Sequence, residues 1–253
     1  MGFVESIVAT ESTEAYSVYH VWERACAPDR NVPEQEVRLM KIILRHAVFI
    51  LVLLPTICAA ASGAQRELAA VLKAKPDPVH GELLFAQCTA CHQADGGGEV
   101  NGSTPRIAGQ HFRVLAKQLV DFRYGKRWDF RMEGMADKHH LAGAQDIADV
   151  SAHVSQLSQA TKRGVGSGEF AEEGGRLYTA QCQSCHGVDA QGNAEKGVPK
   201  LAGQHYAYLM RQMYDAVDGR RPALPQLHSQ RIAPLDFEQV RAVSDYLARI
   251  GWP

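Results

Sequence analysis

The chain reads Cys88-Thr89-Ala90-Cys91-His92, and 94 residues later it reads Cys182-Gln183-Ser184-Cys185-His186. Cys-x-x-Cys-His is the motif through which a chain attaches c-type haem. The two thiols add across the haem vinyl groups as thioethers, and the adjacent imidazole binds the iron as the proximal ligand. We therefore expect two haem c groups, covalently bound by Cys88, Cys91, Cys182 and Cys185, with iron ligands His92 and His186.

Two other chemistries use a Cys-x-x-Cys pair, a zinc knuckle and a redox dithiol. A zinc ribbon places its two pairs roughly 15 to 20 residues apart, whereas these two pairs are 94 residues apart. A thioredoxin-like dithiol lies near a βαβ pattern, and nothing around either motif alternates like a strand. The doubled motif with its histidine therefore favours haem.

The offset of 94 residues extends beyond the cysteines and indicates an internal repeat. Gly81 to Cys88 aligns with Gly175 to Cys182 without a gap, and Pro105 to His111 aligns with Pro199 to His205. Two homologous domains explain this repeat. Each is so short that a haem, rather than a large apolar core, must supply much of its interior.

The last segment of each repeat has the periodicity of an amphipathic helix. Apolar residues recur at spacings of three and four from Ile147 to Leu157 and again from Val240 to Ile250, as they do on one face of a helix. Earlier helices begin near Phe112 and Tyr206 and stop at the glycines that follow. No segment predicts a sheet. The predicted organisation is a first domain over 77–160, a linker over 161–169 and a second domain over 170–253.

The sequence before the first repeat is typical of an export signal. Residues 40–46 form a basic n-region with Lys41 and Arg45, residues 47–61 form an apolar region, and small residues within 59–64 offer cleavage sites. The apolar run is shorter than the roughly 18 to 20 residues of a spanning helix, so we expect a cleaved signal peptide over 40–64 and no stable membrane span. Residues 1–39 are then an upstream extension from a misassigned start.

The charge balance and a glycine run add two smaller predictions. The formal net charge of −1 argues against a nucleic-acid partner, because nucleic-acid-binding domains usually carry a strongly basic face. The run Gly96-Gly97-Gly98 predicts a mobile loop after the first motif.

Taken together, these features resemble the tandem two-haem class I cytochromes c, particularly the cytochrome c-four group. The resemblance covers nearly everything after Asp77, including the two Pro-x-[Ile/Leu]-Ala-Gly-Gln-His runs and the helices that end Gly-Lys-Arg and Gly-Arg-Arg. It implies an all-α fold of two class I cytochrome c domains, each wrapped around one covalently attached haem. It also implies a periplasmic electron carrier in which a methionine shortly before the last helix is each iron's distal ligand.

For the first domain, the resemblance leaves two methionines to choose between. The family-like motif Met-x-x-Met-Ala implies that Met132 is the ligand, whereas the number of residues to Ile147 on the final helix fits Met135 better. We prefer Met132 and infer a short insertion around His139 and His140. Either of these histidines is a less favoured ligand.

The second domain departs from the family pattern, because no methionine lies between Gly219 and its last helix. His228 stands seven residues before Leu235, which is the family spacing, so we predict His228 as the distal ligand. His205 is the other candidate. Its counterpart His111 occupies the same place in the first domain, so this pair is better explained by packing that both domains share.

The predicted ligand sets make the two haems unequal. Methionine and histidine together raise an iron's reduction potential, whereas a second imidazole stabilises the oxidised state, so an electron should rest on the first haem. The predicted function is one-electron transfer, without substrate chemistry, from a donor dehydrogenase or quinol-oxidising complex to an acceptor oxidase or reductase.

Two alternatives belong to other functional classes. A dihaem peroxidase-like oxidoreductase would need an open second iron, with His205 or Arg231 as distal groups. A haem-based redox sensor, or a subunit of a larger dehydrogenase complex, would need a partner domain.

Overall fold

The computed structural model describes residues 35, 38, 63–158 and 162–250. Throughout these ranges the regular secondary structure is helical, apart from an isolated bridge between Asn193 and Val198. The predicted all-α class is therefore confirmed. None of the helices in the described part of the chain has both the length and the apolar character that crossing a membrane requires.

The chain divides into two compact units, residues 1–60 and residues 61–253. The predicted upstream extension over 1–39 and nearly all of the predicted signal peptide over 40–64 fall outside the described residues. Both haem motifs and the helices that carry them belong to the second unit.

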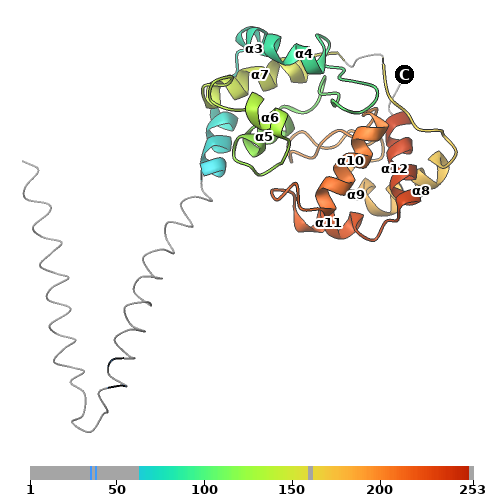
Figure 1. Ribbon diagram of the computed structural model, residues 1–253. Helices are drawn as coiled ribbons and strands as arrows, with labels where there is room; N and C mark the ends of the chain where they lie inside the picture. The colour runs from blue at the N-terminus through green and yellow to red at the C-terminus, as the bar shows by residue number, and fades with distance from the viewer. Residues whose placement is uncertain (1–34, 36–37, 39–62, 159–161, 251–253) are drawn as a thin grey trace, which may run out of the picture. The chain divides into compact units, whose positions relative to one another are not determined.

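The two repeats fold into the same succession of α-helices (Figure 1), and the first repeat also contains a short 3-10 helix. In the first repeat these are α3 (Pro78–Phe85), the 3-10 helix η1 (Ala86–Cys88), α4 (Thr89–His92), α5 (Phe112–Arg123), α6 (Phe130–Met135) and α7 (Ala144–Gln156). In the second they are α8 (Ala171–Gln181), α9 (Gln183–His186), α10 (Tyr206–Val217), α11 (Gln226–Ile232) and α12 (Phe237–Arg249). The periodic segments identified in the sequence correspond to α5, α7, α10 and α12.

The first and last helices of each repeat cross at a glycine. A Cβ atom on Gly81 of α3 would lie 2.1 Å from the carbonyl oxygen of Asp149 on α7, and one on Gly174 of α8 would lie 2.0 Å from that of Ala242 on α12. No larger residue fits at either crossing. These glycines let the helix backbones approach closely, which fixes the haem motif that follows α3 or α8.

The ungapped alignment of Gly81 with Gly175 is wrong by one residue. Gly174 takes the place of Gly81, and the ring pair Tyr178–Tyr246 takes that of Phe85–His153. These helices therefore repeat at 93 residues, although the haem motifs repeat at 94. The extra residue lies between Tyr178 and Cys182, where α8 runs on to Gln181. In the first repeat, α3 ends at Phe85 and tightens into η1.

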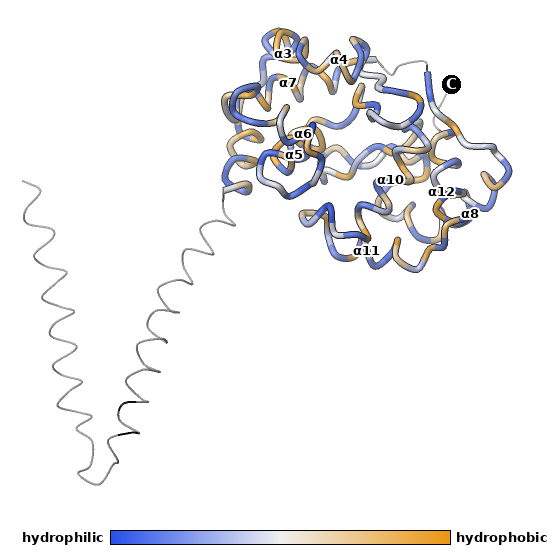
Figure 2. The backbone as a smooth tube through the Cα atoms, in the orientation of Figure 1, coloured by the Kyte–Doolittle hydropathy of each residue, from blue (hydrophilic) through white to orange (hydrophobic). Residues whose placement is uncertain are grey.

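Each repeat has its own apolar core, and the helices that build it are amphipathic, with apolar and polar residues alternating along them (Figure 2). The first core includes Val120, Ile147 and Val150, and the second includes Leu209 and Val243, together with Tyr178, Ala190, Ala202, Leu247 and Ala248. Both cores are small, which suits domains that enclose a prosthetic group.

A helical segment over 63–73 lies before residue 77, where we predicted that the first domain starts. It buries Val71 completely in the first core, and Leu68 packs beside it. Glu67 forms an almost buried ion pair with Arg123 of α5. The first core thus draws on residues that directly follow the predicted cleavage sites.

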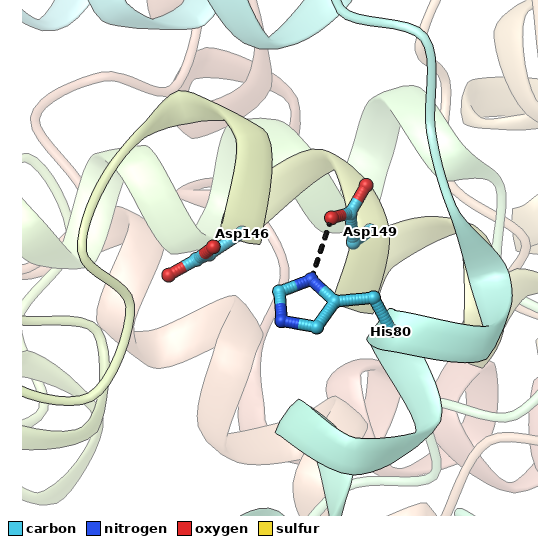
Figure 3. A group of neighbouring side chains, drawn as sticks. All are labelled: His80, Asp146 and Asp149. Carbon is cyan, nitrogen blue, oxygen red and sulfur yellow. Dashed lines mark hydrogen bonds and ion pairs between the residues drawn. The ribbon is translucent and has the colours of Figure 1, made fainter.

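A polar clamp also joins α3 to α7 (Figure 3). The Nδ1 atom of His80 lies 2.9 Å from a carboxylate oxygen of Asp149, whose other oxygen accepts bonds from the Asp77 backbone N–H and the Gln145 side chain. Asp77 in turn caps the start of α3. Asp146 completes the group but directs one oxygen to the backbone N–H of Ala142. These contacts account for the cluster as a link between helices.

The glycine run is a packed turn, so the prediction of a mobile loop was wrong. Gly96 and Gly97 are buried. The Gly96 carbonyl accepts bonds from the N–H groups of Ile107 and Ala108, and the Gly98 N–H donates to the carbonyl of His92. Glycine is needed here because Gly96 and Gly98 have φ values of 66° and 69°.

Candidate functional site

The first motif forms one tight helical turn. Cys88 ends η1, and Cys91 and His92 lie in α4, so residues three positions apart share a face. Cys88 is half-buried against the first core, Cys91 is exposed and His92 is buried. Burial raises the pKa of Cys88 to about 11. Zinc binds the thiolate form of cysteine, which the burial of Cys88 disfavours.

The second motif repeats this arrangement. Cys182 precedes α9 and packs against the second core, Cys185 is exposed, and His186 is buried. Burial again raises the pKa of Cys182. All four cysteines are free of disulfides. The converging ligand group found among the described residues, the clamp of Figure 3, contains no cysteine, so a zinc site built on these pairs has no support.

A backbone carbonyl holds each proximal histidine. The Nδ1 atom of His92 lies 3.1 Å from the carbonyl oxygen of Pro105, and that of His186 lies 3.1 Å from that of Pro199. Burial lowers the pKa of both imidazoles and keeps them neutral. The carbonyl fixes the proton on Nδ1 and leaves Nε2 free for a metal. The sequence analysis named these histidines but not the carbonyl groups that orient them.

In the second domain, the ring of His228 on α11 lies close to that of His186. The centres of the two rings are 6.0 Å apart and their planes are inclined by 34°. Two metal–imidazole bonds of about 2 Å each, with the distance from each nitrogen to its ring centre, add up to roughly 6 Å. Burial, followed by the positive charge that His186 can carry, lowers the pKa of His228. Both rings are therefore neutral, the form that binds a metal.

Known proteins share this architecture. The cytochrome c family model matches residues 79–158 and 171–250. Cytochrome c4 of Pseudomonas aeruginosa is 31% identical over 188 residues, which cover 71% of this chain and 92% of that protein. The structure of reduced recombinant cytochrome c4 from Pseudomonas stutzeri has a TM-score of 0.62 and 30% identity, and the match covers 70% of this chain and 100% of that one.

The chain belongs to the cytochrome c family. Its two cytochrome c domains and its similarity to cytochrome c4 make it a dihaem electron carrier with two covalently bound haem c groups. The prediction of a carrier rather than an enzyme agrees with this membership. A further relative, named a thiosulfate dehydrogenase electron acceptor, comes from Thiomonas intermedia; it is 34% identical over 64% of this chain and 78% of that protein.

Within this cytochrome, the alternative distal groups are poorly placed. His205 is completely buried, and both of its ring nitrogens are used. Nδ1 accepts the backbone N–H of Gly164 at 3.1 Å, and Nε2 donates to the carbonyl of Gly97 at 2.8 Å. His205 therefore serves packing between segments. Arg231 lies exposed on α11.

In the first domain, helix register distinguishes the two methionines. Met132 is the third residue of α6, as His228 is the third residue of α11. Met135 is the last residue of α6, and both methionines are half-buried. His139 is exposed, and His140 bonds to the carboxylate of Asp137 at 3.0 Å.

Two arginines concentrate positive charge beside the ends of α5 and α10. Arg127 donates to the side chains of Gln118, Tyr208 and Gln212, and Arg221 also reaches Gln118. Burial, and then repulsion from Arg127, lowers the pKa of Arg221 to about 10. A haem brings two carboxylates into a domain. A site with adjacent half-buried guanidinium groups is chemically suited to such carboxylates.

Proposed function

We propose that this cytochrome transfers single electrons in the periplasm through two haems with different axial ligands. The first haem would be held by Cys88 and Cys91 with His92 and Met132 on its iron. The second would be held by Cys182 and Cys185 with His186 and His228. The observation that carries this proposal is the close pair of rings of His186 and His228, whose centres are 6.0 Å apart.

The shared helix register of Met132 and His228 supports Met132 over Met135 as the ligand in the first domain. The neutral, buried and carbonyl-bonded state of His92 and His186 supports both as proximal ligands. Haem supplies the one-electron chemistry, and the polypeptide supplies ligands, burial and orientation. With two protein ligands on each iron, no position remains open for a substrate.

The unequal ligands give electron flow a direction. A thioether opposite histidine raises the potential, and an imidazole favours the oxidised iron because it donates more strongly. The electron therefore rests on the first haem, and the second is the more strongly reducing centre. Replacing Met132 should disturb only the first haem, whereas replacing Met135 should leave both haems six-coordinate.

The partners fall into the class of periplasmic redox proteins. The relative named a thiosulfate dehydrogenase electron acceptor supports a donor dehydrogenase, and a quinol-oxidising complex is the other donor class. An oxidase or reductase would accept the electron. The basic and apolar segment over 40–64 supports export by a cleaved signal peptide. Electron-transfer encounters are small and weak, which suits a carrier that exchanges partners.

Low-temperature electron paramagnetic resonance on the oxidised, haem-loaded protein tests the proposal, because it reports the spin state and axial ligands of each iron. We expect two low-spin signals, one of the methionine–histidine type and one of the bis-histidine type. A high-spin signal would reveal an open iron and favour the peroxidase-like alternative. Two methionine–histidine signals would exclude His228 as a ligand.

A further inference from the structure

One glutamine side chain of each domain forms hydrogen bonds with the backbone of the other domain. The backbone N–H of Arg106 donates to Oε1 of Gln204 at 3.0 Å, and Nε2 of Gln204 donates to the Arg106 carbonyl at 2.8 Å. Gln204 is buried, and its Oε1 also accepts the backbone N–H of His205. Because both ends of the amide are engaged, its orientation is fixed.

The Arg106 N–H that bonds to Gln204 belongs to the same peptide group as the Pro105 carbonyl that bonds to His92. The amide between Pro105 and Arg106 accepts the His92 imidazole at its oxygen and donates to Gln204 at its nitrogen. One planar, resonance-stabilised group thus connects a side chain of the second domain with the imidazole of the first.

We call this connection from a glutamine through a peptide group to a proximal histidine a relay. A second relay connects Gln110 of the first domain with His186 of the second. The N–H of Lys200 donates to Oε1 of Gln110 at 3.0 Å, and Nε2 of Gln110 donates to the Lys200 carbonyl at 2.9 Å. The amide between Pro199 and Lys200 accepts the His186 imidazole. Two independent sets of contacts, 94 residues apart in sequence, therefore have the same geometry.

The histidine that follows each glutamine makes a further hydrogen bond to the other domain. His205 reaches the carbonyl of Gly97, and His111 reaches that of Gln191 at 2.7 Å. The next residue in each case, Gly98 or Gly192, donates its N–H to the carbonyl of the proximal histidine. Each Gln–His pair thus holds two peptide groups that contact the other domain's proximal histidine.

We propose that Gln204 sets the basicity of His92 and that Gln110 sets that of His186, so that each domain tunes the haem potential of the other. This inference rests on the proposed role of both histidines as proximal ligands, but not on His228. An amide whose N–H is hydrogen-bonded has a more negative oxygen, because hydrogen bonds in a chain polarise one another. The Pro105 oxygen then draws the Nδ1 proton more strongly.

A stronger bond at Nδ1 raises the basicity of the imidazole toward its metal and so stabilises the oxidised iron. Gln204 and Gln110 are therefore positioning residues that lower the potential of the haem in the opposite domain. Removing one should raise a single potential. The haem that responds lies in the domain that was not altered, an outcome that local damage to the altered domain would not produce.

The test compares Gln204→Met with Gln110→Met in the full-length, haem-loaded protein. Both substitutions keep the side-chain length and remove the acceptor. Redox titration followed by electron paramagnetic resonance gives each iron its own potential. We expect Gln204→Met to raise the first potential and leave the second unchanged within error, and Gln110→Met to do the reverse. Arg211→Lys is the control, because Arg211 also reaches across to the first domain, at the carbonyls of Gly102 and Ser103, and belongs neither to the relays nor to the Arg127–Arg221 site.

A second measurement separates the relay from the ligand assignment. In the reduced protein, proton resonance of ¹⁵N-labelled histidine reports Nδ1–H of His92 and His186, shifted by the haem ring current if they are ligands. Gln204→Met should move the His92 signal upfield by weakening its hydrogen bond, and Gln204→Asn, whose shorter side chain withdraws the acceptor, should also move it upfield. Unshifted histidines would refute the ligand assignment.

Three results would overturn the relay while the ligand assignment stood. In the first, each substitution moves the potential of its own domain. In the second, both potentials move together, as a general loosening of the structure would cause. In the third, Arg211→Lys moves the first potential as far as Gln204→Met does. If the methionine variants do not fold, the Gln204→Asn shift decides alone, and an unmoved His92 signal refutes the relay.

Discussion

At the scale of single residues, Gln93 holds a backbone conformation that is nearly restricted to glycine. It directly follows the first motif with φ 64° and ψ 161°, and Gly187 occupies the matching place with φ 83° and ψ 166°. A side chain in this region costs about 1 to 3 kcal/mol. We therefore expect Gln93→Gly to raise the free energy of unfolding by about 1 kcal/mol in urea titrations, after allowing for the greater unfolded-chain entropy of glycine.

The reverse substitution, Gly187→Gln, is the matched control and should destabilise the protein. Gln93 also donates to the carboxylate of Glu99 at 2.6 Å. A loss of stability in Gln93→Gly would mean that this hydrogen bond outweighs the backbone strain.

His228→Met is the second prediction at this scale. It gives the second haem the ligands proposed for the first, so the second potential should rise, by on the order of a tenth of a volt within the roughly 0.8 V range that axial ligands span. Redox titration measures this shift. His139→Met, at an exposed position, should change neither potential, and an unmoved second potential in His228→Met would refute ligation by His228.

The sequence could predict some of these residues and not others, for physical reasons. The cysteines and proximal histidines form a contiguous motif, because haem attachment constrains neighbours in the chain. His228 was visible as the occupant of a position where methionine was missing. The role that we propose for Gln204 was not visible, because its partner Arg106 lies 98 positions away in the other repeat.

At the scale of helices, the His80–Asp149 clamp between α3 and α7 makes stability depend on pH. The hydrogen bond to Asp149 raises the pKa of His80 above its ordinary 6.5. Burial opposes ionisation of Asp149, but bonds from the Asp77 N–H and from His80 leave its pKa lowered. Asp149 is thus charged over the whole range in which His80 titrates.

A raised folded-state pKa means that protonated His80 stabilises the fold. This contribution is complete below about pH 6.5, the unfolded value, and is lost as the pH rises through the higher folded value. We expect the free energy of unfolding, measured in urea, to fall as the pH rises above 6.5. His80→Gln should flatten this dependence, whereas His139→Gln at an exposed loop position should not. If the free energy of unfolding of His80→Gln still falls as the pH rises above 6.5, the pH dependence comes from another group.

Helices α5, α7, α10 and α12 were predictable because each buries one apolar face, which leaves a period in the sequence. The register of α3 against α8 was not, because a one-residue difference before Cys182 shifts the crossing glycine from Gly175 to Gly174. The sequence alignment favoured Gly175 as the counterpart of Gly81, whereas the close approach of the two helix backbones shows that it is Gly174. Such an approach leaves no periodic pattern.

At the scale of the whole molecule, the repeat in the sequence predicted two similar domains but not how they depend on each other. Gln110 and Gln204 lie in the most similar run of the two repeats. That similarity fitted packing within each domain as well as packing between them. The structure shows that these runs exchange contacts, so each domain completes the surroundings of the other's motif. The linker is bound too, since Asp245 accepts the N–H groups of Gly166 and Gly168.

Because His205 joins the linker to the first domain through Gly164 and Gly97, the two domains should unfold together in a single calorimetric transition. His205→Ala leaves the buried carbonyl of Gly97 and the half-buried N–H of Gly164 unpaired, at up to about 3 kcal/mol each, and should split this transition into two. His153→Ala is the control. His153 packs on Phe85 within the first domain, so its loss should lower the transition temperature of that domain without removing the contacts between domains. Two separate transitions in the unaltered protein would show that the exchanged contacts are too weak to couple the domains.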